Sequence, residues 1–209
     1  MANKGWGFSA VELLVAVSAL CVVAAIALPQ AFNSINYYRL HSDALQIGGY
    51  LNVERMRAAS QGAPYALDVN GSNYAIEQLT PLTYNPLATP ASVTYVSQNP
   101  VVCDFGTQYL APRDTVTNCR PSGVSAYPTP VTGDPSTCGT PFQIYFNTRG
   151  LPVDVHGNAL SSTGGVAIYV MSTNPLTNTV GLIDAVTVSA GGAVQVWNWS
   201  PPTSAWALR

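Results

Sequence analysis

Few side chains in this sequence are suited to catalysis or to metal binding. Histidine occurs twice, as His41 and His156, and the second stands beside an acid in Asp154-Val155-His156. That pair could transfer a proton or hold a metal, but no third ligand type clusters nearby, so an exposed loop pair is the simpler interpretation. The sequence motifs of serine hydrolases, zinc proteases, phosphate-binding loops and dinucleotide-binding folds are absent. The sequence therefore predicts no enzyme, no metal site and no cofactor.

Aromatic residues gather near the C-terminus, where Trp197, Trp199 and Trp206 follow Tyr169. Such a set could stack on the bases of a single strand or on sugars. Packing on the face of a strand, or a contact between subunits, is the simpler interpretation. The net charge is −2 and the only lysine is Lys4, so the chain offers no basic surface for nucleic acid. DNA is therefore not expected as a partner.

Four cysteines are present. Cys21 stands in an apolar run and is expected to act as a small buried hydrophobic residue. Of Cys103, Cys119 and Cys138, two can pair if this part of the chain lies in an oxidising compartment. We favour Cys103–Cys119, because both residues flank one irregular loop that contains proline and aspartate, and Cys119–Cys138 is the alternative. One intrachain disulfide is therefore expected.

An apolar run near the N-terminus organises the rest of the chain. From Phe8 to Leu28 the sequence carries a single formal charge, Glu12. As a helix rising about 1.5 Å per residue, the run is about 30 Å long, enough to cross a bilayer core. A secretory signal peptide, with Lys4 in its basic leader, or a plain transmembrane anchor would explain the run. Neither explains Glu12. Inserting an unpaired charge near the middle of a membrane helix costs ~2.5–3.5 kcal/mol of free energy, and less near an end, so a carboxylate here needs a partner.

The residues around Glu12 resemble a known processing site. Residues 7–12, Gly-Phe-Ser-Ala-Val-Glu, resemble the prepilin cleavage motif of type IV pilins and of type II secretion pseudopilins. A short basic leader stands before the glycine, and Pro29 stands near the end of the apolar run, as in those proteins.

The resemblance implies how the N-terminus is processed. In that family the prepilin peptidase cuts after the glycine, on the cytoplasmic side, and methylates the new N-terminal phenylalanine. Carried over to this sequence, cleavage falls between Gly7 and Phe8, and Phe8 is N-methylated. Its amine stays cationic after one methylation. The resemblance therefore gives Glu12 a role in assembly, as the partner of the Phe8 amine of a neighbouring subunit.

The helix is expected to continue past Pro29, which would bend it or open it locally. Apolar residues then recur at helical spacing until Gly62 and Pro64 end the pattern. They are Leu40, Ala44, Ile47, Leu51 and Ala58. After a leader of residues 1–7, we therefore predict one long bent helix. Residues 8–29 form its transmembrane or filament-core half, and residues 30–62 form its amphipathic half.

Residues 63–209 are predicted to form an extracytoplasmic β-rich domain. Alternating residues on both sides of Asn70-Gly71 predict a hairpin. Later strand patterns, joined by connections that favour antiparallel pairing, lie at residues 142–146, 166–170, 185–188 and 194–197. Prolines break up residues 80–140, which are predicted to be a loop-rich insertion with short strands at most. The predicted fold class is α+β, a long N-terminal hydrophobic helix packed on an antiparallel sheet domain.

Three segments of the chain are similar to the GspH/FimT family of pseudopilins and minor pilins. They are Arg57-Ala58-Ala59 with Gly62, Phe142–Gly150 and Val186–Val196. Some members of that family bind DNA through basic residues in the last hairpin, but the corresponding turn here, residues 191–195, has none.

The two resemblances together imply a structural subunit of a type IV pilus or a type II secretion pseudopilus. It would be inserted in the inner membrane, with its N-terminus in the cytoplasm and its domain in the periplasm, and then assembled. The implied partners are other pilin or pseudopilin subunits, the prepilin peptidase, the inner-membrane assembly platform and membrane lipid. A minor pilin or pseudopilin is favoured. A major pilin, and a tip adhesin or DNA-uptake pilin that binds DNA or glycan, are the alternatives.

Overall fold

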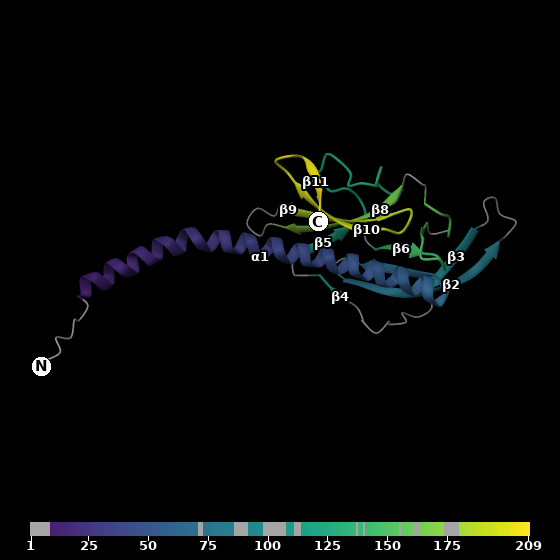
Figure 1. The fold of residues 1–209 in the computed structure, drawn as a ribbon, viewed down its shortest axis with the longest axis horizontal. Coiled ribbons are helices and arrows are strands. Elements are labelled where there is room, and N and C mark those ends of the chain that lie inside the picture. Colours follow the sequence, from purple (N-terminus) through teal and green to yellow (C-terminus); the bar gives the residue numbers. More distant parts are fainter. Residues whose placement is uncertain are drawn as a thin grey trace, which may run out of the picture. The chain divides into compact units, whose positions relative to one another are not determined.

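The computed structural model describes residues 9–70, 73–85, 92–97, 108–110, 114–136, 138–139, 141–154, 156–160, 164–173 and 180–209. Its described part consists of one long helix followed by antiparallel strands in two sheets (Figure 1). The chain divides into two units, Met1–Tyr38 and Arg39–Arg209. The α+β class with an apolar N-terminal helix and antiparallel sheets is therefore confirmed.

The single helix α1 runs from Ala10 to Gln61 and passes through Pro29 without ending. Gly62 follows with a φ of 62°, the left-handed conformation that commonly closes a helix, and Pro64 prevents its continuation. The predicted continuation of the helix past Pro29 and its C-terminal stop are thus confirmed, whereas its predicted start at Phe8 lies outside the described residues.

The first sheet has the strand order β3-β2-β1-β6-β7, and β4 pairs with β2. Its strands are β1 (Tyr65–Asn70), β2 (Asn73–Asn85), β3 (Ser92–Ser97), β4 (Gln108–Tyr109), β6 (Phe142–Phe146) and β7 (Pro152–Val153). The pairing of Asn70 with Asn73 confirms the hairpin predicted around Asn70-Gly71. Residues 80–140 contribute more sheet than expected, because β2 continues to Asn85 and pairs with β3 there.

The second sheet has the strand order β11-β10-β9-β8-β5. Its strands are β5 (Asp114–Thr117), β8 (Gly165–Thr173), β9 (Val180–Ser189), β10 (Val194–Ser200) and β11 (Ala205–Leu208). The patterns at residues 166–170, 185–188 and 194–197 are confirmed as strands of this sheet. The sequence patterns did not predict β5 and β11, which form its two edges.

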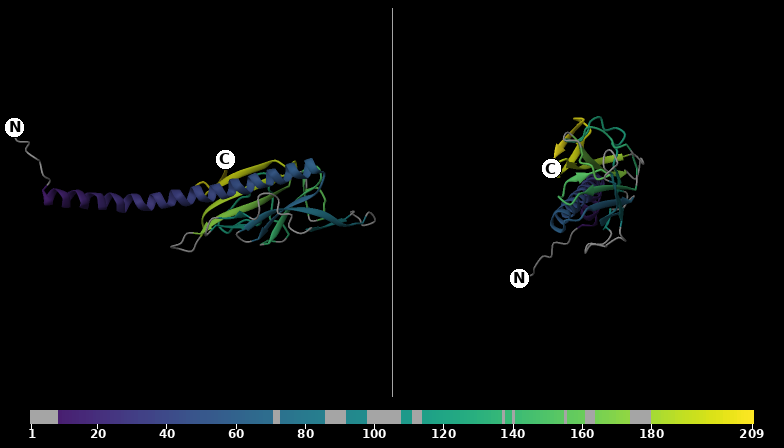
Figure 2. Two further views of the ribbon diagram at one scale, coloured as in Figure 1. Left: turned by 90° about the horizontal axis from the view of Figure 1, so that it is seen from below. Right: turned by 90° about the vertical axis from the view of Figure 1, so that its right-hand side faces the viewer.

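The main core forms where α1 packs against both sheets. Figure 2 shows the C-terminal half of the helix lying along the strands. The five apolar residues predicted to face the domain are each fully buried and belong to one cluster with residues of both sheets. The sheet residues of this cluster include Leu67, Val69, Ile144, Phe146, Ile168, Val170, Val186 and Val188.

The second sheet is buried on its other face as well. Strand side chains alternate between faces, so Tyr169 and Ala185 point away from α1 while their neighbours point toward it. These two residues pack with Tyr127 and Val131, from the segment between β5 and β6. The described part of this segment, residues 118–136, 138–139 and 141, therefore covers the outer face of the sheet, and we call it the strap.

Candidate functional site

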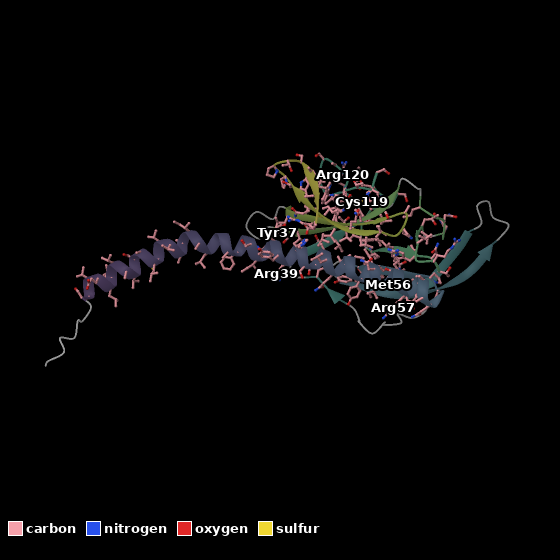
Figure 3. All side chains as sticks on the ribbon, viewed as in Figure 1. Tyr37, Arg39, Met56, Arg57, Cys119 and Arg120 are labelled. Carbon is pink, nitrogen blue, oxygen red and sulfur yellow. A yellow bond between two sulfur atoms is a disulfide. The ribbon has the colours of Figure 1, made fainter. Side chains whose placement is uncertain are left out.

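The N-terminal part of α1 is the candidate functional element. Ala10–Leu28 is long and apolar enough to cross a membrane, and none of it is buried (Figure 3). Its large apolar side chains are all at least half exposed. They are Val11, Leu13, Leu14, Val15, Val17, Leu20, Val22, Val23, Ile26 and Leu28. A continuous apolar surface of this kind is unfavourable in water and indicates a surface meant for lipid or for other helices.

Glu12 takes part in a capping box at the start of this helix. The Ser9 backbone N–H donates to Glu12 Oε2 at 3.2 Å, and the Val11 N–H donates to Ser9 Oγ at 3.3 Å. The pattern Ser-x-x-Glu before an apolar run is a known helix-start signal, which our sequence reasoning overlooked. The carboxylate also lies at the positive end of the helix dipole. Glu12 therefore has a local structural role besides any role toward another subunit. The predicted cleavage residues, Gly7 and Phe8, lie outside the described residues.

Cys21 is exposed on this helix rather than buried as we expected, and none of Ala10–Leu28 is buried. Its thiol therefore belongs to the same outward-facing surface as the aliphatic residues around it.

The expected disulfide is present, but the favoured pairing was wrong. Cys119 pairs with Cys138, with 5.3 Å between their Cα atoms, within the usual range for a disulfide. Two hydrogen bonds hold the ends of the strap together around it. The Arg120 N–H donates to Asp134 Oδ1 at 2.7 Å, and the Gly139 N–H donates to Asn118 Oδ1 at 2.9 Å. Cys103 lies outside the described residues.

The tryptophans near the C-terminus pack against the rest of the domain: Trp199 is buried, and Trp197 and Trp206 are partly buried. Trp199 is only 6% exposed and packs with Val124 of the strap. The Trp206 Nε1–H donates to Ala126 O at 2.9 Å, which ties β11 to the strap. The Trp197 Nε1–H donates to Thr187 Oγ1 at 2.9 Å, across the sheet. The interpretation as strand-face packing is therefore confirmed.

The acid and histidine at residues 154 and 156 form a turn. Asp154 Oδ1 accepts the backbone N–H groups of His156 at 2.9 Å and of Asn158 at 2.8 Å, an Asx-type turn on the surface. Within the described part of the chain, no group of three or more His, Cys, Asp or Glu side chains could hold a metal ion. Asp154 and His156 thus lie in a turn, as the loop-pair interpretation expected.

Two ionisable contacts that the sequence did not predict join α1 to the second sheet. His41 Nδ1 lies 2.9 Å from Oδ2 of Asp184, which is 1% exposed. Asp43 of α1 and Asp114 of β5 are both buried and influence each other electrostatically. No sequence pattern predicts either contact. His41 and Asp184, for example, are 143 positions apart and meet only in the folded domain.

The C-terminal end of α1 and the turns that follow β6 and β9 meet at one corner of the domain. Arg55 Nη1 donates to Gly192 O at 2.8 Å. Gly150 has a φ of 71°, and a Cβ there would lie 2.8 Å from Arg55 O and 3.4 Å from the Cβ of Ala59. Gly192 has a φ of 81°, and a Cβ there would lie 3.1 Å from Gly150 O. The end of α1 and two strand turns thus approach so closely that only glycine fits without strain.

No protein-family model, no functionally characterised protein and no solved structure matches the chain.

Proposed function

We propose that this chain is a non-enzymatic, pilin-like subunit, anchored in the inner membrane and then assembled into a type IV pilus or a type II secretion pseudopilus. A minor pilin or pseudopilin is favoured. One observation carries the proposal. A single continuous helix has an exposed apolar first part, Ala10–Leu28, and a second part whose apolar stripe is fully buried in the domain.

Two environments can shield the exposed apolar side chains of α1 from water. Lipid does so in the membrane, because the segment is long enough to span the hydrocarbon core. A bundle of similar helices does so in a filament, where the aliphatic side chains pack together. Transfer between the two leaves the apolar surface covered throughout, so the same segment can serve as anchor and as assembly element.

Glu12 favours the bundle as the final environment. In lipid its carboxylate is costly, although less so near the end of a helix than at its centre. In a bundle the methylated amine of Phe8 from a neighbouring subunit supplies a cation. Processing by the prepilin peptidase after Gly7 creates that amine, and the assembly platform of the inner membrane brings the subunits together.

Charge and cysteine chemistry support the proposed topology. Lys4 precedes the apolar segment and favours a cytoplasmic N-terminus. The Cys119–Cys138 disulfide fits a domain in the oxidising periplasm. The alternative of a tip adhesin or DNA-uptake pilin gains no support from the tryptophans, because Trp199 and Trp206 pack against the strap.

Substitutions at Glu12 and Ser9 test the proposal, because the capping box allows charge and capping to be separated. Glu12→Leu removes both the charge and the capping hydrogen bond, whereas Glu12→Gln removes the charge and keeps a side chain that can cap. Ser9→Ala removes the cap hydroxyl and keeps the charge. Glu12→Asp keeps the charge on a side chain that is one methylene group shorter.

We expect the Glu12→Leu and Glu12→Gln subunits to insert normally, to accumulate in the inner membrane and to be missing from sheared filaments. Leaving one partner of a buried charge pair alone typically costs ~3–5 kcal/mol. Ser9→Ala should assemble, and Glu12→Asp should be intermediate. The measurement is the ratio of subunit in the filament and membrane fractions. Assembly of Glu12→Gln at the wild-type level would reduce Glu12 to a helix cap and remove this support for the proposal.

A further inference from the structure

The part of α1 that follows the membrane-spanning run has an apolar side of its own. It comprises residues 28–38, and we call it the juxtamembrane segment. Its apolar residues recur at spacings of three and four, so at about 100° per residue they share one helix face. They are Leu28, Ala31, Phe32, Ile35 and Tyr38, and all are exposed. The exposed fraction reaches 62% for Phe32 and 70% for Tyr38. The intervening positions are largely polar, with Gln30, Asn33, Ser34 and Asn36.

This apolar face is not the face that packs in the domain. The buried stripe of α1 begins at Leu40 and continues through Ala44 and Ile47. Tyr38 stands two residues before Leu40, which places it about 160° away around the helix. The domain core therefore does not account for the apolar residues of the juxtamembrane segment.

A membrane surface fits this two-sided segment. It follows directly on Ala10–Leu28, which is long and apolar enough to cross the hydrocarbon core, and it rises about 15 Å along the helix axis. Its amide and hydroxyl side chains disfavour the hydrocarbon core, whereas its apolar face disfavours water. A helix of this kind lies in the headgroup layer, with its apolar face buried ~5–10 Å at the acyl boundary. Pro29 removes one helical hydrogen bond, which allows the helix to change direction where the segment begins.

The side chains on the apolar face favour lipid over a second helix. Tyr38, whose ring lies edge-on to that of Tyr37 at 5.9 Å between centroids, has an apolar ring and a polar hydroxyl, and such residues are enriched at membrane interfaces. Close pairing of helices in membranes uses small residues, and Ala31 is the single small residue on this face. Residues 28–38 carry no formal charge, so the attraction is apolar rather than electrostatic.

We propose that residues 28–38 form an interfacial anchor, which lies in the headgroup layer with Phe32, Ile35 and Tyr38 toward the acyl chains. The membrane boundary then runs along this segment, and the turns of α1 that enter the domain start at the membrane surface. The inference rests on membrane insertion of Ala10–Leu28 and is independent of cleavage and of filament assembly.

Spin labels on the full-length chain test the interfacial anchor. Cys21→Ser and Cys103→Ser together leave the Cys119–Cys138 disulfide intact and provide the background for single cysteines at residues 31–38. In phosphatidylcholine vesicles, each nitroxide is exposed to oxygen, which dissolves in lipid, and to a water-soluble nickel complex. We expect oxygen collisions to dominate at the apolar positions and nickel collisions at positions 34 and 36. The ratio of the two should therefore reverse with the helical period.

Labels at Val22 and Leu45 separate this inference from the membrane anchor itself. Leu45 is 51% exposed and stands seven residues beyond Tyr38, on the same helix face, so nickel should dominate there. Oxygen should dominate at Val22, and a label in water at that position would overturn the anchor and this inference together. With Val22 in lipid, one reagent dominating at all of residues 31–38 would overturn this inference alone. Spin–spin broadening at position 35 that disappears on dilution with unlabelled chain would also overturn it, because a second copy would then cover the face.

Substitutions assign the binding to the apolar face. The variant with both Phe32→Ser and Ile35→Ser should lose the excess of oxygen collisions at position 38, whereas Ser34→Ala should keep it. An unchanged profile in the double variant would refute the inference. High salt should leave the profile of the wild-type face unchanged, because the segment is uncharged. Loss of the profile in high salt would indicate attachment through Arg39 and would contradict an apolar anchor.

Discussion

Removing the Cys119–Cys138 disulfide should destabilise the domain by an amount that the structure allows us to estimate. The variant with both Cys119→Ser and Cys138→Ser leaves no unpaired thiol in the strap. The two cysteines are 19 positions apart, and on the chain-entropy model a closed loop of that length is worth about 3 kcal/mol. For a domain of this size each kcal/mol shifts the melting temperature by about 2–4 °C, so we expect a fall of about 6–12 °C.

The effect should be visible at the tryptophans, because the strap covers them. Trp199 and Trp206 pack with Val124 and Ala126 of the strap, so a loosened strap should expose their indole rings to water. The assay is thermal unfolding of the full-length chain in detergent micelles, followed by tryptophan fluorescence and by circular dichroism. In the variant, the fluorescence transition should move at least as far as the backbone transition.

The matched controls are Cys103→Ser and Cys21→Ser, which should leave the melting temperature unchanged under oxidising conditions. Adding a reductant to the wild type should reproduce the melting temperature of the double variant. If Cys103→Ser lowers the melting temperature as much as the double variant does, while Cys138→Ser alone has no effect, the pairing is Cys103–Cys119 and this account of the strap fails.

Further predictions concern the packing of the domain. Gly150→Ala should destabilise the domain by about 1–3 kcal/mol, because Gly150 has a positive φ and a Cβ there would lie 2.8 Å from Arg55 O. Gly49→Ala on α1, where a Cβ would meet nothing within 4 Å, should stabilise the domain by about 0.5–1 kcal/mol. Chemical denaturation measures both changes, and an unchanged free energy of unfolding in Gly150→Ala would contradict the close approach. Leu51→Ala should cost about 2–5 kcal/mol because Leu51 is fully buried, and Leu45→Ala on the exposed side of the same helix should cost far less; equal costs would show that α1 packs in another orientation.

Local patterns predicted the elements whose signals are local. The stripe from Leu40 to Ala58 follows the helical period, and the hairpin at Asn70-Gly71 depends on turn chemistry that neighbouring residues supply. Both were predictable because no distant residue decides them. The capping box of Ser9 and Glu12 is equally local, because the pattern Ser-x-x-Glu before an apolar run predicts it.

The features that the sequence could not predict depend on long-range contacts. β5 has the sequence Asp-Thr-Val-Thr, which carries little apolar pattern, and it is a strand because β8 pairs with it. The disulfide partner of Cys119 is decided by the path of the strap over the sheet, which no local signal specifies. The contact between His41 and Asp184 likewise exists only once α1 has docked on β9.

The measurement that tests the central claim most directly is the intact mass of the chain purified from membranes of cells that express the prepilin peptidase. The pilin-like account predicts a mature chain that begins at Phe8 and carries one methyl group on its terminal amine. A bulky substitution such as Gly7→Leu should block this processing and keep the leader. A wild-type chain that begins at Met1 or Ala2 in those cells would contradict the account.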